Sequence, residues 1–200
     1  MTITLYTLIA YFFGAIPFGL LVAKSRGVDI RAHGSGNIGA TNVFRVIGKG
    51  WGIFTFTLDA LKGFIPAFFF PMWGGVEPVY GVLFGLTAIA GHSFPIYLKF
   101  KGGKGVATSA GMLLGVAPMA VGIAFASWVV CMVLSRIVSL SSIVAAIMVS
   151  VVIWLEDDKS RVVQIAITCL SVLIVWLHRA NIKRLLNGTE NRFGKKKEAA

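Results

Sequence analysis

Residues 3–23 read ITLYTLIAYFFGAIPFGLLVA, and residues 51–72 read WGIFTFTLDALKGFIPAFFFPM. Each segment is long enough to cross a bilayer, because a crossing takes about 20 helical residues at about 1.5 Å of rise per residue. Between them lies a polar, glycine-rich stretch, GSGNIGATNVFR, at residues 34–45. This arrangement predicts a membrane protein with a polar loop held at the membrane surface.

The composition of the whole chain supports an all-α integral membrane protein. Of its 200 residues, 56% are hydrophobic and 14% are charged, and the mean hydropathy is +0.82. Soluble domains are nearer to about 25% charged. No long hydrophilic run could fold separately, so we expect a single transmembrane domain over residues 1–193 and a basic C-terminal tail over residues 194–200. The first apolar run lacks a basic n-region and an Ala-x-Ala exit, so we expect it to be a retained span.

Apolar segments predict a seven-transmembrane-helix bundle. The segments cover residues 3–23, 51–72, 79–98, 105–118, 120–135, 138–155 and 162–178. The fourth and fifth are short and are separated by a turn around Pro118. A bundle of six spans, with residues 105–135 as one bent or re-entrant element, is the alternative.

The basic residues predict how this bundle is oriented. Sixteen of the 19 basic residues, all except Lys62, Lys159 and Arg161, fall on one side of a seven-span bundle. The positive-inside rule places this side, with the C-terminus, in the cytoplasm and the N-terminus outside. The net charge of +11 therefore follows membrane topology and does not indicate a nucleic acid partner. Inside the second segment, Asp59 and Lys62 share a helical face, and we expect a structural ion pair.

The first polar cluster comprises residues 34–45. Its glycines expose backbone N–H groups and Arg45 adds a permanent planar charge, a combination that suits a phosphorylated ligand. The alternative is that Arg45 only snorkels at a helix end. The other candidate ligand-binding residues of this cluster are Ser35, Gly36, Asn37, Thr41 and Asn42.

The second polar cluster comprises residues 91–95 and 100–108. Lys104 lies where we expect a helix to begin, so backbone donors and a point charge would face an anion there. The glycines around it, also candidates for binding, are Gly102, Gly103 and Gly105. The spacing is not that of a Walker A loop, and a basic interfacial turn is the alternative. His92 is either a ligand contact or a hydrogen-bonded interfacial histidine.

The third polar cluster comprises residues 178–190. His178 and Asn181 are three residues apart at the end of the last span, so both can face one site. A histidine there could accept a proton near neutral pH, and capping or headgroup contact is the alternative. Ser142, in a group of serines that opens the sixth span, is a ligand contact or a helix cap.

Several kinds of chemistry lack support in the sequence. There is no Gly-x-Ser-x-Gly elbow, no histidine followed five residues later by aspartate, and no cytoplasmic carboxylate pair or Cys/His cluster. We therefore expect no covalent nucleophile, no metal and no other cofactor. Cys131 and Cys169 lie in apolar runs and are expected to be buried free thiols. Any reaction would depend on positioning and charge neutralisation.

Together the three clusters resemble the PlsY family, the acyl-phosphate-dependent glycerol-3-phosphate acyltransferases of bacteria. The resemblance rests on Ser35–Asn42 with Arg45, on Gly91-His92 with Phe100–Thr108, and on His178–Glu190, and it covers nearly the whole chain. It implies a seven-span enzyme of the bacterial inner membrane with a cytoplasmic active site. It also implies acyl transfer from acyl phosphate to the sn-1 hydroxyl of glycerol 3-phosphate, which gives lysophosphatidic acid and phosphate.

The resemblance and the residue chemistry together give hypothetical roles. Arg45 and Lys104 would bind phosphate, assisted by Ser35 and by the backbone of residues 102–105. Asn181 and Ser142 would orient glycerol 3-phosphate. His178 would accept the hydroxyl proton or position the substrate, and a substrate phosphate is the alternative base, because its second pKa is about 6.

Two other functions are compatible with glycines and basic residues at helix ends. A transporter or exchanger of phosphorylated small solutes would use them at a midplane site, yet most spans here are apolar through their centres. A noncatalytic scaffold would use its basic face to hold anionic membrane lipid.

Overall fold

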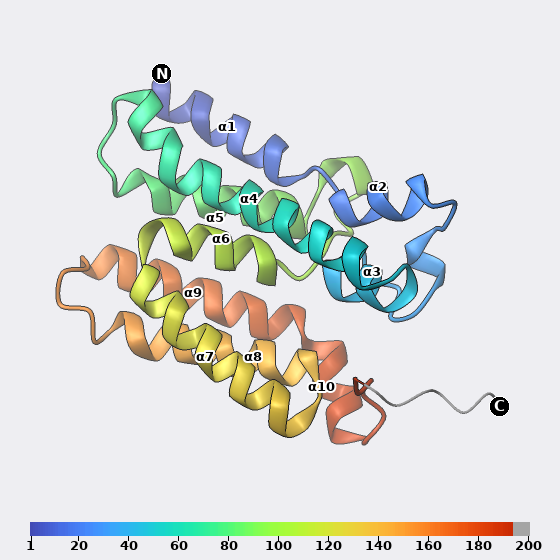
Figure 1. Cartoon of the computed structure of the whole chain (residues 1–200). Coiled ribbons are helices and arrows are strands. Elements are labelled where there is room, and N and C mark those ends of the chain that lie inside the picture. Colours follow the sequence, from blue (N-terminus) through green and yellow to red (C-terminus); the bar gives the residue numbers. More distant parts are fainter. Residues whose placement is uncertain (194–200) are drawn as a thin grey trace. The chain divides into compact units, whose positions relative to one another are not determined.

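The computed structural model describes residues 1–193, which are predominantly helical and contain no strand (Figure 1). The basic tail expected at residues 194–200 lies outside the described residues. The helices are α1 (Thr2–Gly14), α2 (Phe18–Ser25), η1 (Ile30–Ala32), α3 (Ala40–Val46), α4 (Lys49–Gly74), α5 (Tyr80–Ser93), η2 (Ile96–Leu98), α6 (Val106–Val116), α7 (Pro118–Ser135), α8 (Val138–Ile153), α9 (Arg161–Leu177) and α10 (Arg179–Leu186).

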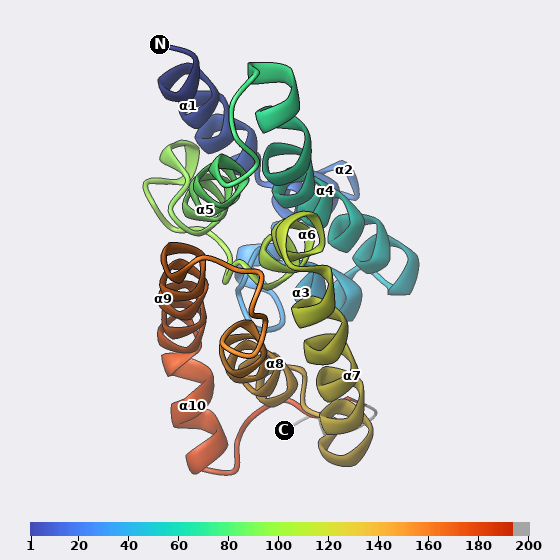
Figure 2. The same cartoon turned by 90° about the vertical axis from the view of Figure 1, so that its left-hand side faces the viewer.

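The chain divides into two compact units. The first unit is Met1–Pro118, with α1 to α6, and the second runs from Met119 onward, with α7 to α10. In the first unit α4 packs along α5 and α6, and α1 packs along α5. In the second unit α8 packs along α9, and α10 follows α9 after a bend of 55° (Figure 2). The expectation of one domain over residues 1–193 stays a prediction.

Within residues 1–193, four helical segments are long and apolar enough to cross a membrane. They are Thr2–Ser25, Lys49–Gly74, Tyr80–Leu98 and Pro118–Ser135, and α9 with α10 makes a fifth if the bent pair is one span. The helices α6 and α8 have 11 and 16 residues. At about 1.5 Å per residue they rise roughly 16 and 24 Å, less than the roughly 30 Å of a bilayer core. Every predicted segment thus contains a helix, while the count of seven crossings stays a prediction.

Two prolines mark helix boundaries in the first unit. The predicted segment 3–23 is one span in sequence, but it is broken at residues 15–17 into α1 and α2. Pro17 has no N–H to continue the hydrogen-bonding pattern of α1. The expected turn near Pro118 is present, since α6 ends at Val116 and α7 begins at Pro118, a residue well suited to the first position of a helix.

The helices of the first unit pack with their backbones in close approach. A Cβ atom at Gly63 of α4 would overlap with the Thr108 carbonyl oxygen of α6. A Cβ atom at Gly111 of α6 would likewise overlap with the Ala60 carbonyl oxygen of α4. Small residues allow membrane helices to associate through close van der Waals contact, so glycine is required on both sides of this α4–α6 interface.

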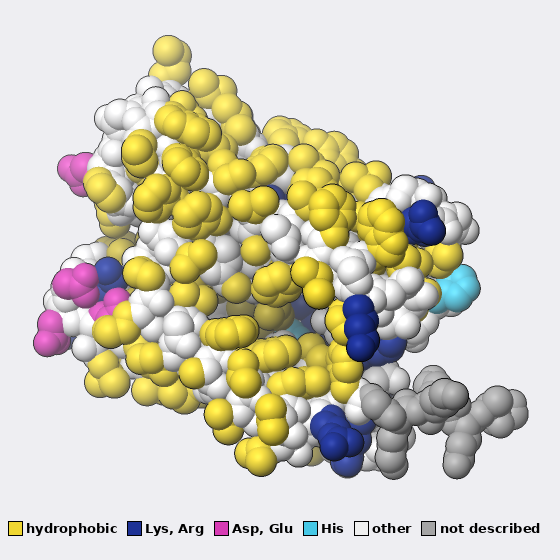
Figure 3. All heavy atoms as spheres, viewed as in Figure 1, with side chains coloured by type: hydrophobic (Ala, Val, Ile, Leu, Met, Phe, Trp, Pro, Cys, Tyr) yellow, Lys and Arg dark blue, Asp and Glu magenta, His cyan; other side chains and the backbone are white. Residues whose placement is uncertain are grey.

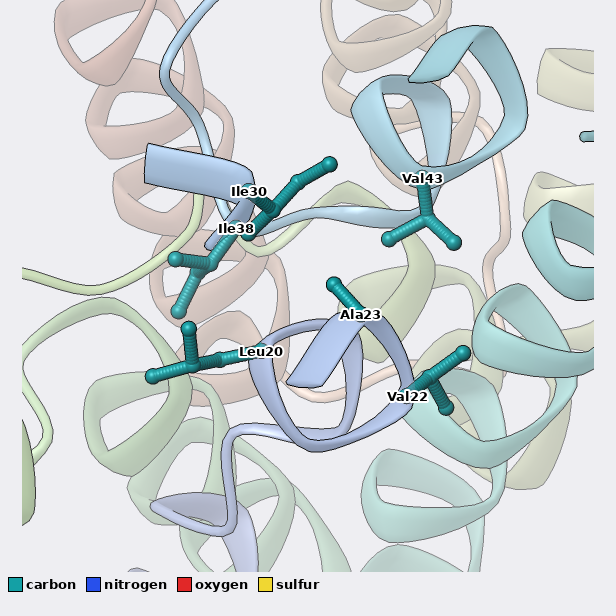
Figure 4. Packing of buried hydrophobic residues seen from close by; sticks show 6 residues of the cluster. All are labelled: Leu20, Val22, Ala23, Ile30, Ile38 and Val43. Carbon is teal, nitrogen blue, oxygen red and sulfur yellow. The ribbon is translucent and has the colours of Figure 1, made fainter. Parts of the chain in front are cut away.

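A buried apolar cluster attaches the first polar cluster to α2. Figure 4 shows its members, which come from α2, η1, the following loop and α3: Leu20, Val22, Ala23, Ile30, Ile38 and Val43. Leu98 of η2, which precedes the Gly102–Gly105 turn, packs against the same cluster. The close approach of Gly19 to the Ile38 carbonyl oxygen fixes the loop further. This packing secures both the loop before α3 and the segment leading to the second polar cluster.

The outer faces of the helices are apolar. In the view of Figure 3, hydrophobic side chains are spread over the visible face of each unit. The acidic side chains lie toward one end of each unit and most basic side chains toward the opposite end. Cys169 is exposed on α9 and Cys131 of α7 is half-buried, and both thiols are free. The expectation of free thiols is confirmed, but the expectation of burial is wrong. A lipid-facing surface is as apolar as the protein core, so an apolar run does not distinguish them.

Candidate active site

Asn42 organises the first polar cluster. Its side chain is 1% exposed. Its Oδ1 accepts a hydrogen bond from the Ser35 N–H at 2.9 Å, and its Nδ2 lies 2.9–3.2 Å from the carbonyl oxygens of Ile30, His33 and Asn37. A buried backbone group without a partner is costly, so one amide side chain satisfies the polar groups of the loop. These contacts assign Asn42 a structural task, and its expected contact with substrate stays a prediction.

The loop presents Ser35 between two glycines in the left-handed region. Gly34 and Gly36 have φ values of 61° and 71°. Ser35 is exposed, and a Cβ atom at Gly34 would overlap with Oδ1 of Asn42. Asn37 accepts a hydrogen bond from the Gly39 N–H at 2.7 Å, which holds the chain where it enters α3. The loop therefore has a defined conformation that depends on glycine.

The second half of the first polar cluster is helical. Residues 34–45 were expected to form one loop, but α3 begins at Ala40 and contains Thr41, Asn42 and Arg45. Arg45 is exposed in the last turn of α3, where a cation is favourable near the helix C-terminus. The helix gives Arg45 a fixed base next to the membrane-spanning α4.

The turn of the second polar cluster is bonded to the end of α5. The Gly102 N–H donates to the Ser93 carbonyl and the Gly103 N–H donates to the His92 carbonyl, each at 3.1 Å. We expected these amides to bind phosphate. Both N–H groups donate within the protein, and their expected contact with substrate stays a prediction. Their glycine identity has another cause, because a Cβ atom at Gly103 would overlap with the His92 ring.

Lys104 and Gly105 lead directly into α6. Gly105 is the N-cap residue of α6 with φ of 76°, and its carbonyl accepts from the Ser109 N–H at 2.7 Å. The first-turn amides of α6 thus follow Lys104 directly, an arrangement favourable for an anion. Lys104 is half-buried at this position. Its expected role in phosphate binding agrees with this geometry and stays a prediction.

Asp59 and Lys62 form the expected ion pair. Lys62 Nζ lies 2.8 Å from Asp59 Oδ1, and both side chains are buried. His92 is buried beside them, with Nδ1 3.6 Å from the same carboxylate oxygen. The contacts of His92 are therefore within the protein, as expected if His92 is a structural histidine and not a ligand contact.

His178 of the third polar cluster lies at the bend between α9 and α10. Its side chain is buried, and Nδ1 lies 2.8 Å from the Ile174 carbonyl oxygen. A carbonyl oxygen only accepts, so Nδ1 carries the proton, and in the neutral ring Nε2 carries the lone pair. This tautomer suits a proton acceptor at Nε2.

Glu190 is the residue of this cluster to which sequence reasoning gave no role. Its Oε1 accepts from Ser139 Oγ at 2.9 Å and from Asn181 Nδ2 at 2.7 Å, and its Oε2 accepts from Arg184 Nε at 2.7 Å. Partial burial opposes its charged form, but the hydrogen bonds from Asn181, Arg184 and Ser139 outweigh burial and hold the pKa of Glu190 below its usual 4.5. Glu190 thereby ties α10 to the start of α8 and orients Asn181. One sign of this role was present in the sequence, because Glu190 is a single acidic residue within a basic segment.

Ser142 lies in the first turns of α8. Its hydroxyl donates to the Val138 carbonyl at 2.9 Å and lies 3.3 Å from the Trp128 indole Nε1, which donates to it. These bonds join α7 to α8. They indicate a local structural role for Ser142 more than a helix cap. The expected contact of Ser142 with glycerol 3-phosphate stays a prediction.

Comparison with known proteins identifies the family. A family model described as glycerol-3-phosphate acyltransferase matches residues 4–188. The chain belongs to this family. The acyltransferase is 44% identical over 187 residues to the glycerol-3-phosphate acyltransferase of Geobacter sulfurreducens, covering 94% of this chain and 95% of that relative. It is 46% identical over 198 residues to the same enzyme of Macrococcus caseolyticus, covering 98% and 100%.

Solved structures agree with this assignment. The acyltransferase resembles a crystal structure of PlsY (YgiH), an integral membrane glycerol 3-phosphate acyltransferase, in its glycerol 3-phosphate form. The TM-score is 0.91 at 40% identity, over 97% of this chain and 96% of that one. The lysophosphatidic acid form of that protein matches with a TM-score of 0.88 over the same shares. The expected family is confirmed, and neither the transporter nor the scaffold is retained.

Proposed function

We propose that this glycerol-3-phosphate acyltransferase takes its acyl group directly from acyl phosphate. The observation that carries the proposal is the pair of basic residues, Arg45 and Lys104, each placed at a helix end beside a glycine-rich turn. Both proposed substrates carry phosphate, and their charges repel unless they are neutralised. A guanidinium and an ammonium supply that neutralisation without a metal.

The proposed reaction does not need a covalent catalyst. The sn-1 hydroxyl oxygen of glycerol 3-phosphate attacks the acyl carbon, the bond from that carbon to the phosphate oxygen breaks, and inorganic phosphate leaves. The donor is a mixed anhydride, so its phosphate is already a good leaving group. The protein then needs alignment, stabilisation of the oxyanion and an acceptor for the hydroxyl proton.

His178 is our candidate for that acceptor. With Nδ1 donating to the Ile174 carbonyl, Nε2 is the ring nitrogen that would accept the proton of the substrate hydroxyl. Asn181, held by Glu190, and Ser142 orient glycerol 3-phosphate. The phosphate of a substrate is the alternative base, and in that case His178 positions the substrate.

We place the enzyme in the bacterial inner membrane, with seven spans, the N-terminus outside, and the C-terminus and active site in the cytoplasm. The distribution of basic residues supports this orientation, as does the separation of acidic and basic ends within each unit (Figure 3). The short helices α6 and α8 would cross as spans flanked by polar residues.

Substitutions of the two basic residues test the proposal. Purified Arg45→Ala and Lys104→Ala proteins should release phosphate from acyl phosphate, with glycerol 3-phosphate present, about 10²-fold more slowly or worse, as expected for lost transition-state donors. The exposed neighbours Lys49→Ala and Lys101→Ala are matched controls that should stay within about twofold, as surface substitutions usually do. Near-normal rates for folded Arg45→Ala and Lys104→Ala would refute the assignment.

A histidine variant separates the two candidate bases. His178→Ala should lower kcat by about 10²–10⁴-fold if the ring accepts the proton. A folded His178→Ala protein that keeps most of its kcat would remove His178 as the general base and leave the substrate phosphate in that role.

A further inference from the structure

A buried charge pair lies within the membrane-spanning helix α4, outside the sequence ranges of the three polar clusters. Asp59 and Lys62 are 2% and 1% exposed, and their charged atoms are 2.8 Å apart. Lys62 Nζ also donates at 2.8 Å to the carbonyl of Ile16, in the break between α1 and α2. Ionisable groups inside a span are costly and commonly serve function.

The pair is adjacent to the end of α5. His92 Nδ1 lies 3.6 Å from Asp59 Oδ1, which is too long for a hydrogen bond but close enough for a strong electrostatic interaction in a buried setting. His92 is 6% exposed, so its ring has little freedom to leave this position. The carboxylate of Asp59 therefore faces two side chains, Lys62 on its own helix and His92 on α5.

His92 in turn holds the turn that carries Lys104. Its carbonyl accepts the Gly103 N–H at 3.1 Å, and its ring lies where a Cβ atom of Gly103 would be. The adjacent Ser93 carbonyl accepts the Gly102 N–H at the same distance. Both the backbone and the ring of His92 thus fix the turn, and Lys104 is the next residue along the chain.

Helix packing alone does not require this pair. Gly63 and Gly111 already bring α4 and α6 into backbone contact, one residue away from Lys62 on the α4 side. Replacing a buried ion pair by apolar residues is often neutral or stabilising, so a pair that only joined helices would be dispensable. Apolar residues could not supply a fixed negative charge opposite His92.

We propose that Asp59 and Lys62 are positioning residues that act through His92 to place the Gly102–Gly103 turn and hence Lys104. The charge pair holds His92, His92 holds the turn, and the turn sets where the Lys104 ammonium meets a substrate phosphate. The inference rests on the proposed phosphate-binding role of Lys104.

The test compares one charge removed with both removed. Asp59→Asn leaves Lys62 without its partner, whereas Asp59→Asn/Lys62→Met removes both charges and should regain the melting temperature of the wild type. In both proteins we expect the KM for the substrate whose binding Lys104→Ala weakens to rise about tenfold, with kcat changed less. A displaced Lys104 would lose binding energy that is common to the ground state and the transition state. Thr57→Ala, on the exposed face of α4, is the matched control and should change neither constant.

A purely structural role predicts a different outcome. In that case the folded double variant would regain wild-type KM together with its stability, and this result would overturn the proposal even if Asp59→Asn alone failed to fold. In a Lys104→Ala background, the double substitution should add less than about twofold to KM, because residues that act through a common group are not additive. Full additivity there would also contradict the proposal.

A binding measurement separates this proposal from the choice of acyl donor. Calorimetric titration with glycerol 3-phosphate alone requires no donor. A wild-type protein that binds glycerol 3-phosphate but gives no product with acyl phosphate would refute the donor and leave the positioning test intact. If Lys104→Ala weakens glycerol 3-phosphate binding and the double variant does not, the positioning proposal fails while the donor assignment stands.

Discussion

Replacing Glu190 with glutamine tests whether one carboxylate holds the third polar cluster together. The Glu190 side chain is 7% exposed and accepts hydrogen bonds from Ser139, Asn181 and Arg184. Glutamine has nearly the same shape but only one oxygen. In either orientation its NH₂ group faces a donor, either Arg184 or the pair formed by Asn181 and Ser139.

The expected cost follows from these contacts. Hydrogen bonds to a charged group contribute about 1.5–3 kcal/mol each, and a donor facing a donor adds a desolvation penalty. The Arg184 side chain is 38% exposed, so solvent screens its share. The Ser139 hydroxyl can rotate and accept from the new amide, which recovers part of the loss. We therefore expect a net destabilisation of about 2 kcal/mol.

Thermal unfolding and kinetics of the purified protein in detergent measure this effect. A loss of about 2 kcal/mol corresponds to a fall in Tm of about 4–8 °C for a chain of this length. Because Asn181 loses its charged acceptor, the KM for glycerol 3-phosphate should rise as well. The exposed Glu77→Gln in the α4–α5 connection is the matched control and should leave both quantities unchanged. If Glu190→Gln melts and reacts like the wild type, the assigned hydrogen bonds do not organise the site.

Three further predictions concern Asn42, Gly103 and the pH dependence of Glu190. Asn42→Ala removes the acceptor of the Ser35 N–H and the donor to three carbonyls. It should lower the free energy of unfolding by about 1–3 kcal/mol and lower kcat/KM, as denaturation and rate measurements would show. Unchanged stability would contradict the role of Asn42. Gly103→Ala should raise a substrate KM with the fold retained, because its methyl group would displace the His92 ring. Gly50 has open space around it, so Gly50→Ala should leave the KM unchanged. Equal KM values for the two variants would count against this steric explanation. The pKa of Glu190 is depressed, so its stabilisation is present above its usual value of 4.5 and is lost as pH falls through the lower folded pKa. The Tm of the wild type should therefore drop more steeply than that of Glu190→Gln in acid, and parallel Tm profiles would show that Glu190 gains no such stabilisation.

The helices were predictable because their signal is local. A run of apolar residues of bilayer length requires a helix, since backbone groups in lipid must bond within their own segment. The break before Pro17 could have been predicted from the missing N–H of proline. The faces of the helices could not, as Cys169 shows, because lipid and protein interior favour the same side chains.

The residues of the candidate site could be predicted from the sequence, but their hydrogen-bond partners could not. Polar residues between apolar spans identified the three clusters, and the family comparison confirmed the activity they indicated. The partners of Asn42, the role of Glu190 and the internal bonds of the Gly102 and Gly103 amides depend on residues brought together by folding. Hydrogen-bond partners 51 residues apart, as Ser139 and Glu190 are, leave no periodic signal in the sequence.

The choice of acyl donor is the most direct test of the account. Purified wild-type protein is given glycerol 3-phosphate with either acyl phosphate or acyl-CoA of the same chain length, and lysophosphatidic acid is measured. The account predicts product and an equal amount of inorganic phosphate with acyl phosphate, and no product with acyl-CoA. Product from acyl-CoA alone would contradict direct transfer from acyl phosphate.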